Sequence, residues 1–352
     1  MSSKATGAHA MRTTMSDTGQ NESMLTVIQR TYGTPDVLEI ARTGRPAPAE
    51  SEVLVRIHAT TVTATEAVFR RGKPYISRLF TGLRKPKLKT LGEEFAGEVV
   101  AVGNGVTKFT TGDRVFGTAG PAFGAAAEYL CLSEDEAMIP KPREASFEEA
   151  AASVDGFLTA LPFLRDKGHI SAGHRVLING ASGSVGAAAV QIAKYNGAEV
   201  TGVCSSANVD LVKSLGADHV IDYTTTDFTR NREAYDIIFD TVGKTTFRKC
   251  RRSLRSHGIF LEAGMSMGVL GSVLLSSLFG QRKAKIAATG LRPTSERIED
   301  LKLLRDLMAD GTIVPVIDRI HPLKEIADAH RYVDTGHKKG NVVIRVAREE
   351  RG

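Results

Sequence analysis

The stretch NGASGSVG at residues 179–186 indicates the fold of this 352-residue chain. The apolar run RVLI precedes it, and the helix-forming run AAAVQIAKY follows it. A glycine-rich turn between a strand and a helix is typical of a dinucleotide site, because the helix N-terminus offers free N–H groups and partial positive charge to a pyrophosphate. The alternative is a plain strand-to-helix turn whose glycines serve only packing.

Each glycine of this turn has an expected role. Gly180 permits the tight bend, Gly183 lets the backbone approach a pyrophosphate, and Gly186 lets the helix pack closely on the strand. We therefore expect the residues of the turn to bind the cofactor, namely Gly180, Ser182, Gly183, Ser184, Val185 and Gly186.

The end of the next apolar run bears on the choice between NADH and NADPH. Sites that prefer NAD usually place Asp or Glu there to bind the ribose 2′-hydroxyl. In this chain VCSSAN occupies residues 203–208, and the first acid is Asp210. Ser205, Ser206 and Asn208 can donate to a 2′-phosphate, so the sequence predicts NADPH. The alternative is that Ser205 or Asn208 caps the following helix, which is compatible with a phosphate nearby.

Strands and helices alternate after Phe147. This alternation predicts an α/β fold with a doubly wound parallel sheet that has helices on both faces. The expected strands are RVLING, AEVTGVC, DHVIDY, YDIIFDTVG and GIFLEAG, and the expected helices cover residues 184–195, 208–215 and 245–254.

The two ends of the chain have a different pattern. Residues 25–131 form short alternating runs, such as EVLVRIHAT at 52–60, which predict an all-β module with little helix. Beyond residue 292 we expect a helix at 296–308, a strand IVPVID, a helix at 323–333 and a strand NVVIRV.

Composition limits the class of protein. A content of 42% hydrophobic and 24% charged residues is typical of a globular chain. Residues 1–23, rich in Ser, Thr and Gly, are expected to be a disordered extension and not a signal peptide. Cys131, Cys204 and Cys250 form no close pair, which favours the cytoplasm. The longest apolar run, 269–279, is too short to span a membrane and predicts a buried or interface helix.

Basic residues are concentrated in one segment. Eight lie between Glu66 and Glu93 with no acid among them: Arg70, Arg71, Lys73, Arg78, Arg84, Lys85, Lys87 and Lys89. We expect a basic surface that steers an anionic cofactor or substrate, or a solvated loop. Phe69, Tyr75 and Phe80 are interleaved with these cations, which keeps open a third hypothesis, an NADPH-liganded protein that binds nucleic acid.

Several motifs occur together in order. GEEFAGEVVAVG, GDRVFG, NGASGSVGAAAVQIAK, SLGADHVIDY, DIIFDTVG and HRYVDTGHKKGNVVIRV span almost all of the chain from residue 25 to 346. In these motifs the chain resembles the medium-chain dehydrogenase/reductase superfamily, in its zinc-independent quinone-oxidoreductase-like branch. The resemblance implies a GroES-like catalytic domain from residues 24–150 and 288–352, enclosing a Rossmann NADP-binding domain at 151–287. We also expect a homodimer.

The resemblance also implies positions for the two halves of the cofactor. On the adenosine side it implies contacts at Ser205, Ser206, Asn208 and Tyr223, and nearer the nicotinamide at Val242, Asn341, Thr63 and Thr159. Thr63 stands where members of the branch commonly have Asn.

A zinc site is not expected. Thr63, Glu93 and Asp155 occupy the positions that match the catalytic zinc ligands of related alcohol dehydrogenases. A threonine and two carboxylates lack the sulfur and imidazole that zinc sites use, and the four-cysteine structural lobe is absent from the sequence.

Candidate catalytic residues are Thr63 and Asp155, with Glu66 and Glu94 as further polar groups. Asp155 could instead be the N-cap of an apolar helix, and Glu93 and Glu94 could be ordinary strand residues.

Without a metal, hydride transfer to an electron-poor acceptor is easier than oxidation of an alcohol. The sequence therefore predicts an NADPH-dependent enzyme that reduces a small electrophilic substrate, a quinone or an α,β-unsaturated carbonyl, with water as a candidate proton source. An NADP-dependent alcohol or aldehyde dehydrogenase remains the alternative.

Overall fold

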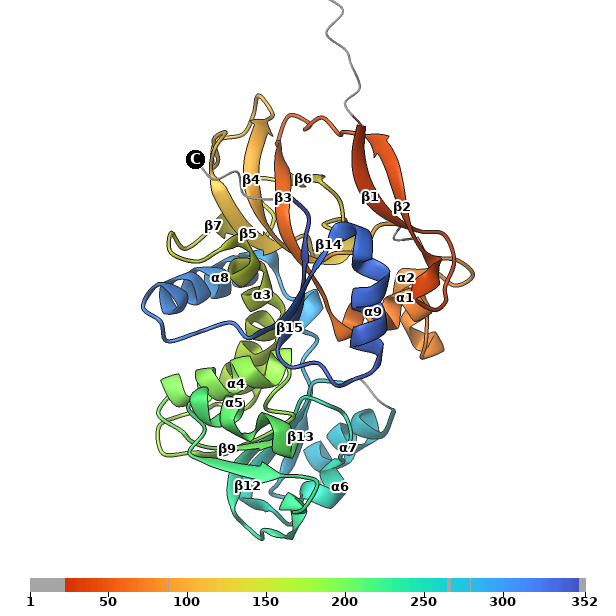
Figure 1. The fold of residues 1–352 in the computed structure, drawn as a ribbon. Coiled ribbons are helices and arrows are strands. Elements are labelled where there is room, and N and C mark those ends of the chain that lie inside the picture. The colour runs from red at the N-terminus through yellow and green to blue at the C-terminus, as the bar shows by residue number, and fades with distance from the viewer. Residues whose placement is uncertain (1–22, 88, 265–266, 279, 348–352) are drawn as a thin grey trace, which may run out of the picture.

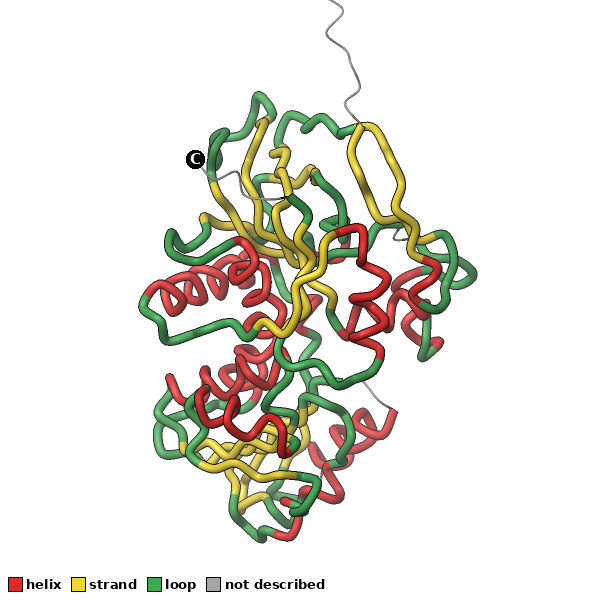
Figure 2. The backbone as a smooth tube through the Cα atoms, in the orientation of Figure 1, coloured by secondary structure: helices red, strands yellow, loops and turns green. Residues whose placement is uncertain are grey.

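The computed structural model describes residues 23–87, 89–264, 267–278 and 280–347. Its strands form a six-stranded sheet, a seven-stranded sheet and a two-stranded hairpin. Figure 2 shows the strands in two main groups with helices between them. All but the last residue of the extension expected at 1–23 lies outside the described residues, and Ser23 already belongs to a strand.

The six-stranded sheet is entirely parallel, in the order β10-β9-β8-β11-β12-β13. The chain winds outward from β8 through β9 to β10, then crosses to β11 and winds the other way. The carboxyl ends of β8 and β11 therefore flank the switch point where open α/β sheets bind ligands. This topology confirms the expected fold class. The strands are β8 Arg175–Asn179, β9 Glu199–Cys204, β10 His219–Asp222, β11 Tyr235–Asp240, β12 Leu254–Glu262 and β13 Lys283–Lys285.

The helices of this part follow the predicted order. The helix expected at residues 184–195 is confirmed as α4. The helix expected at 245–254 is wrong in extent, because Leu254 already pairs with Tyr235 in the sheet. The helices are α4 Ser184–Tyr195, α5 Val209–Ser214, α6 Phe247–Cys250 and α7 Met267–Leu278.

The seven-stranded sheet combines both ends of the chain. Strand β15 pairs antiparallel with β3, so the C-terminal segment joins the N-terminal β-module. The strands are β3 Glu52–Val62, β4 Glu94–Val102, β5 Arg114–Thr118, β6 Tyr129–Ser133, β7 Met138–Pro140, β14 Ile317–Pro322 and β15 Asn341–Arg345, and the hairpin is β1 Ser23–Gln29 with β2 Leu38–Gly44. The helices of this half are α1 Ala64–Arg71, α2 Arg78–Thr81, α8 Thr294–Ala309 and α9 Ile326–Asp334.

The strand expected at IVPVID begins later than predicted. Val314 exchanges two hydrogen bonds with the Gln191 side chain of α4, at 2.8 and 3.1 Å. This contact holds the first residues of the run against a helix, so pairing with β15 starts only at Ile317.

Helix α3, Phe147–Pro162, connects the two halves. One hydrophobic core includes Ala59 and Phe116 of the seven-stranded sheet together with Val176 and Ile178 of the parallel sheet. The expected domain boundary at residues 150/151 falls inside α3, and the division into two domains stays a prediction.

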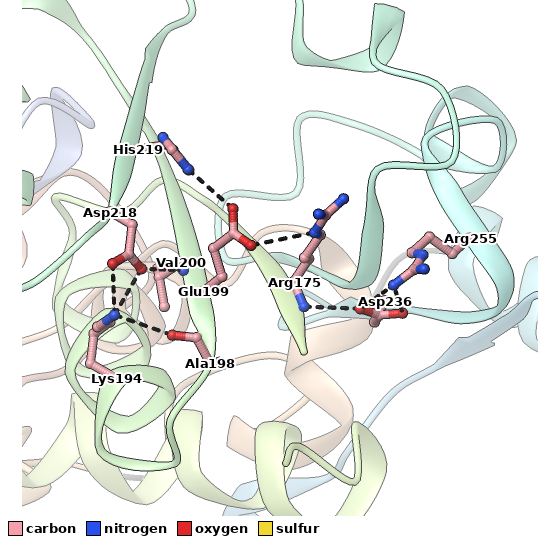
Figure 3. Close-up of polar contacts among 9 residues, drawn as sticks. All are labelled: Arg175, Lys194, Ala198, Glu199, Val200, Asp218, His219, Asp236 and Arg255. Carbon is pink, nitrogen blue, oxygen red and sulfur yellow. Dashed lines mark hydrogen bonds and ion pairs between the residues drawn. The ribbon is translucent and has the colours of Figure 1, made fainter. Parts of the chain in front are cut away.

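The amino ends of the parallel strands are held by ion pairs (Figure 3). Glu199 contacts His219 at 3.1 Å and Arg175 at 3.3 Å, and the Arg175 N–H donates to Asp236. Lys194 binds Asp218 at 2.8 Å. These contacts hold the amino edge of the sheet together through its own side chains.

Helix α7 differs from one expectation. Leu274, Leu275 and Leu278 are exposed, so the expectation of a buried helix is wrong for these three residues, and the expectation of an interface helix stays a prediction. No helix among the described residues is long and apolar enough to cross a membrane.

Candidate active site

The glycines of the turn between β8 and α4 have unequal surroundings. Gly180 adopts φ +83°, and a Cβ there would lie 2.2 Å from Val242 Cγ2. A Cβ on Gly186 would lie 2.0 Å from the Gly180 carbonyl oxygen. Gly183 is different, because its nearest neighbour would be 3.5 Å away. A plain packing turn therefore accounts for Gly180 and Gly186, whereas a Cβ at Gly183 would make only ordinary van der Waals contact, so packing does not require glycine there.

A loop from the other half of the molecule closes on this turn. The Gly340 N–H donates to the Ser182 carbonyl at 2.7 Å, and Gly183 and Gly340 form an isolated parallel bridge. Asn341 follows directly, and its side-chain amide donates to the Val316 carbonyl at 3.1 Å. The structure thus places Asn341 beside the turn.

The serines and the asparagine after β9 are brought together with the turn. The Asn208 amide donates to Ser182 Oγ at 3.1 Å and to Ser205 Oγ at 3.3 Å. Ser205 and Asn208 occupy N-cap positions, but neither side chain makes a capping hydrogen bond. These side chains therefore form a polar group at the carboxyl edge of the sheet.

An acid that sequence reasoning missed lies close to Ser206. Asp222 ends β10, where it pairs in register with Cys204, and the Ser206 hydroxyl donates to its carboxylate at 2.5 Å. This hydrogen bond, with others from Thr224, holds the pKa of Asp222 below its ordinary value. The sequence signal for this acid was the predicted strand DHVIDY. Because that strand is parallel to β9, the acid at its end lies beside the end of β9. Tyr223 follows Asp222 and is exposed.

Val242 lies at the end of β11, next to the turn. Its N–H donates to Asp240 at 3.1 Å, and its side chain covers Gly180. The buried Asp240 also accepts from the Asn179 amide at 3.0 Å, which joins the ends of β8 and β11. Thr159 lies four residues after Asp155 on α3, hence on the same face of that helix, and is half-buried.

Thr63 is a buried helix cap. Its hydroxyl accepts from the Glu66 N–H at 3.1 Å, and the Glu66 carboxylate accepts from the Thr63 N–H at 3.1 Å. The second Glu66 oxygen accepts from the Gly92 N–H at 2.6 Å. This capping box begins α1 and fixes Glu66 next to the segment that enters β4.

Four carboxyl groups from three segments influence one another. Burial is the largest cause of a raised pKa at all four, because it disfavours the charged form. The pKa of Glu66 rises to about 8 despite its two backbone hydrogen bonds, and that of Glu93 rises to about 7, with the Asp155 charge as the second cause. Burial also raises the pKa of Glu94, which accepts a hydrogen bond from Thr61 at 2.6 Å. We call Glu66, Glu93, Glu94 and Asp155 the carboxyl cluster.

Asp155 joins the carboxyl cluster to the glycine turn. Ser184, the first residue of α4, donates its hydroxyl to Asp155 at 3.0 Å. Asp155 lies in the middle of α3, whose N-cap is Ser146, so the interpretation of Asp155 as an N-cap is wrong. A Cβ on the neighbouring Gly156 would lie 2.7 Å from the Ser184 carbonyl, which shows how closely α3 crosses α4.

Lys338 is a second residue that the sequence did not single out. Its charge opposes the burial effect on the pKa of Asp155, and burial lowers the pKa of Lys338 itself. Its ammonium donates to the Gly340 carbonyl at 2.5 Å, in the loop that closes on the turn. Candidate residues of both halves therefore meet around Asp155.

Zinc does not fit the three positions that match zinc ligands. The Thr63 hydroxyl serves the helix cap, and Glu93 and Asp155 offer only oxygen. Within the described ranges, no group of three or more His, Cys, Asp or Glu side chains is arranged to hold a metal ion.

Two family models match the chain. Residues 49–143 match the alcohol dehydrogenase GroES-like domain, and residues 215–344 match the zinc-binding dehydrogenase family.

Named relatives cover most of the chain. It is 30% identical to the quinone oxidoreductase of Homo sapiens, over 87% of this chain and 92% of that protein. It is 28% identical to the chloroplastic NADPH-dependent alkenal/one oxidoreductase of Arabidopsis thaliana, over 98% of this chain and 85% of that protein. Among solved structures, the quinone oxidoreductase from Coxiella burnetii is 29% identical with a TM-score of 0.82, over 93% of this chain and 100% of that one.

Proposed function

Because the chain belongs to the medium-chain dehydrogenase/reductase superfamily, in its quinone-oxidoreductase-like branch, we propose that it reduces a quinone or an α,β-unsaturated carbonyl with NADPH and without a metal ion. The observation that carries the proposal is that Gly183, at the switch point, has no packing reason to be glycine, while the neighbouring Ser184 donates a hydrogen bond to Asp155. The names of the human and Arabidopsis relatives support the two acceptor classes.

The residues around the turn support a dinucleotide. The N-terminus of α4 directs free N–H groups toward the open side of Gly183, where a pyrophosphate would bind. Ser182, Ser205 and Asn208 present hydroxyl and amide groups that can donate to a 2′-phosphate. Asp222 faces Ser206, so we place the phosphate on the side of Ser205 and Asn208. Bound NADPH would supply a hydride from its nicotinamide ring.

The carboxyl cluster supports a pathway that delivers a proton to the substrate. Reduction of an activated C=C adds a hydride to the β-carbon and a proton to the α-carbon, so a proton must reach the site in each cycle. Glu93, with a pKa of about 7, is partly protonated at neutral pH, and Asp155 lies between it and the turn. We assign Asp155 the role of orienting Ser184 and of passing a proton delivered by water, and Thr63 the role of holding Glu66 in place through the capping box of α1.

The donor set supports chemistry without zinc. At the matching positions a capped threonine and two carboxyls with raised pKa values are poor partners for zinc, which prefers sulfur and imidazole. An electron-poor acceptor needs no Lewis acid to accept a hydride, because its own carbonyl stabilises the developing anion.

The test is a turnover panel on protein treated with a chelator and analysed for metal. We expect NADPH consumption with quinones or enones, a clear preference for NADPH over NADH, and no loss of rate after chelation. Activity restricted to alcohols or aldehydes, or activity that depends on stoichiometric zinc, would contradict the proposal. Oligonucleotide binding with no NADPH turnover would favour the nucleic-acid hypothesis instead.

We also propose a homodimer in the cytoplasm. The exposed leucines of α7 support a contact with a second copy, and the three cysteines are free thiols, as in a reducing compartment. Light scattering at several protein concentrations tests the oligomeric state.

A further inference from the structure

The segment that is rich in basic residues connects α1 to β4, and the structure divides its cations into two groups. Arg70 is fully buried and forms an ion pair with Asp334 at 2.5 Å, so the expectation that it lies on the surface is wrong. Arg71 lies 3.6 Å from the same carboxylate. Arg78 stacks over the Tyr32 ring at 4.5 Å and donates to the Gly72 carbonyl. These three cations serve the local structure.

The other five cations are exposed and make no ion pair within the described parts of the chain. They are Lys73, Arg84, Lys85, Lys87 and Lys89. Positive charge that is neither buried nor paired on the protein is available to an anionic partner.

Large apolar side chains are exposed among these cations. Tyr75, Ile76, Leu79 and Leu83 are exposed to 68%, 49%, 67% and 68%. A segment that only needs solvation has no reason to present aliphatic side chains to water, since each exposed group forfeits hydrophobic stabilisation. We call these four residues and the five free cations the basic apolar face.

The face has a defined backbone. The Tyr32 hydroxyl donates to the Gly82 carbonyl at 2.5 Å, and the Lys87 N–H donates to the Thr81 carbonyl at 2.7 Å. The Gln29 N–H donates to the Lys89 carbonyl at 2.7 Å, which ties the end of the segment to β1. In Figure 1 this part lies at the right-hand side of the molecule, below the β1–β2 hairpin.

We propose that the basic apolar face binds the surface of an anionic lipid bilayer. Interfacial binding combines apolar side chains that enter the headgroup region with Lys and Arg that attract anionic lipids, and the face presents both on one short segment. Nucleic acid fits less well. Three of the four exposed apolar residues are aliphatic, and Arg78 stacks over the ring of the fourth, Tyr75, at 4.9 Å, whereas single-strand sites present aromatic rings for bases to stack on. This inference does not depend on the proposed reaction.

The test is co-sedimentation of the full chain with vesicles of phosphatidylcholine, with and without phosphatidylserine. We expect binding only to the vesicles that contain phosphatidylserine, and loss of binding at about 1 M salt, where the Debye length is only about 3 Å. Each cation contributes about fivefold in affinity at such a surface. The quadruple variant Arg84→Gln, Lys85→Gln, Lys87→Gln and Lys89→Gln is therefore expected to bind about 600-fold more weakly.

Two matched controls make the result specific. The variant Arg143→Gln, Lys213→Gln, Lys249→Gln and Lys324→Gln removes four exposed cations outside the face and lowers the net charge equally. Leu79→Ser with Leu83→Ser should weaken vesicle binding, whereas Leu291→Ser with Val314→Ser removes exposed aliphatic side chains outside the face and away from α7 and should not. Thermal unfolding checks that each variant is folded.

Three outcomes would overturn the proposal. They are no binding of the folded protein to anionic vesicles, equal losses in the variants on and outside the face, and tight binding of a single-stranded oligonucleotide by a protein that ignores the vesicles.

Discussion

The glycine turn and the carboxyl cluster touch through one hydrogen bond, from Ser184 to Asp155, yet they are built in opposite ways. The turn is eight consecutive residues whose steric demands are local. The carboxyl cluster gathers residues from α1, from the start of β4 and from the middle of α3, and the property that its members share is a raised pKa. The geometry of the turn can therefore be inferred from its sequence. The raised pKa values of the cluster cannot, because they arise only when the chain folds.

The largest effect is expected at the turn, where Gly186→Ala would place a Cβ 2.0 Å from the Gly180 carbonyl. Helix α4 must shift away from the strand, which should cost about 3 kcal/mol of unfolding free energy. Denaturant unfolding measures this cost. Gly183→Ala is the matched control, because its Cβ meets nothing closer than 3.5 Å and should leave stability nearly unchanged.

The same pair separates packing from ligand binding. If a pyrophosphate approaches Gly183, then Gly183→Ala should weaken NADPH binding by about tenfold or more while the fold stays intact. Unchanged NADPH affinity in this variant would contradict pyrophosphate binding at Gly183 and would mean that the glycines of the turn serve only packing.

The second prediction concerns cofactor choice. Ser205→Asp places a carboxylate where we expect the 2′-phosphate, so the ratio of kcat/KM for NADPH to that for NADH should fall by about 100-fold, since like charges in contact cost several kcal/mol. Ser214→Asp, in the last turn of α5, is the control and should leave the ratio unchanged. A preference for NADH in the unaltered protein would contradict the placement of a 2′-phosphate at Ser205.

The third prediction uses the raised pKa of Glu93. Its folded pKa of about 7 exceeds the ordinary 4.5, so the folded chain holds a proton that the unfolded chain has lost. This contribution to stability is complete below 4.5 and is lost as the pH rises through about 7. Between these limits the unfolding free energy of the native chain should fall by about 3 kcal/mol more than that of Glu93→Gln. If the unfolding free energies of the native chain and of Glu93→Gln changed equally with pH, the raised pKa of Glu93 would be contradicted.

The smallest effect is expected at the junction. Ser184→Ala removes the hydrogen bond that lowers the pKa of Asp155, which should cost about 1 kcal/mol and move the pKa of Asp155 further upward. The shift should appear as a change in the pH profile of kcat. Ser153→Ala, which removes a hydroxyl that donates only to the Ala150 carbonyl within α3, should leave that profile in place.

The fold and the turn were predictable because their signals are periodic or local. The limits of α4 and the doubly wound order followed from alternation and from the glycines. The predictions failed where contacts between residues far apart in the sequence determine the end of an element. Contact with the Gln191 side chain makes β14 begin later than predicted. The helix near Cys250 ends early because Leu254 pairs with β11. The N-cap of α3 is Ser146 and not Asp155.

The site was predictable in part for the same reason. Ser205, Asn208 and the turn lie together, because consecutive parallel strands end at one edge. Asp222 and Lys338 were missed, since their relevance depends on neighbours supplied by another strand and by the closing loop. The burial of Arg70 likewise depends on Asp334, far along the sequence.

The most direct test of the central claim follows the hydride itself. Chelator-treated protein is incubated with an enone and with NADPH that carries deuterium on the transferred position of C4, and the product is analysed by mass spectrometry and NMR. The account predicts one deuterium at the β-carbon and none at the α-carbon, where the proton derives from water. A saturated product without deuterium at the β-carbon, or consumption of NADPH with no reduction of the C=C or of a quinone, would contradict it.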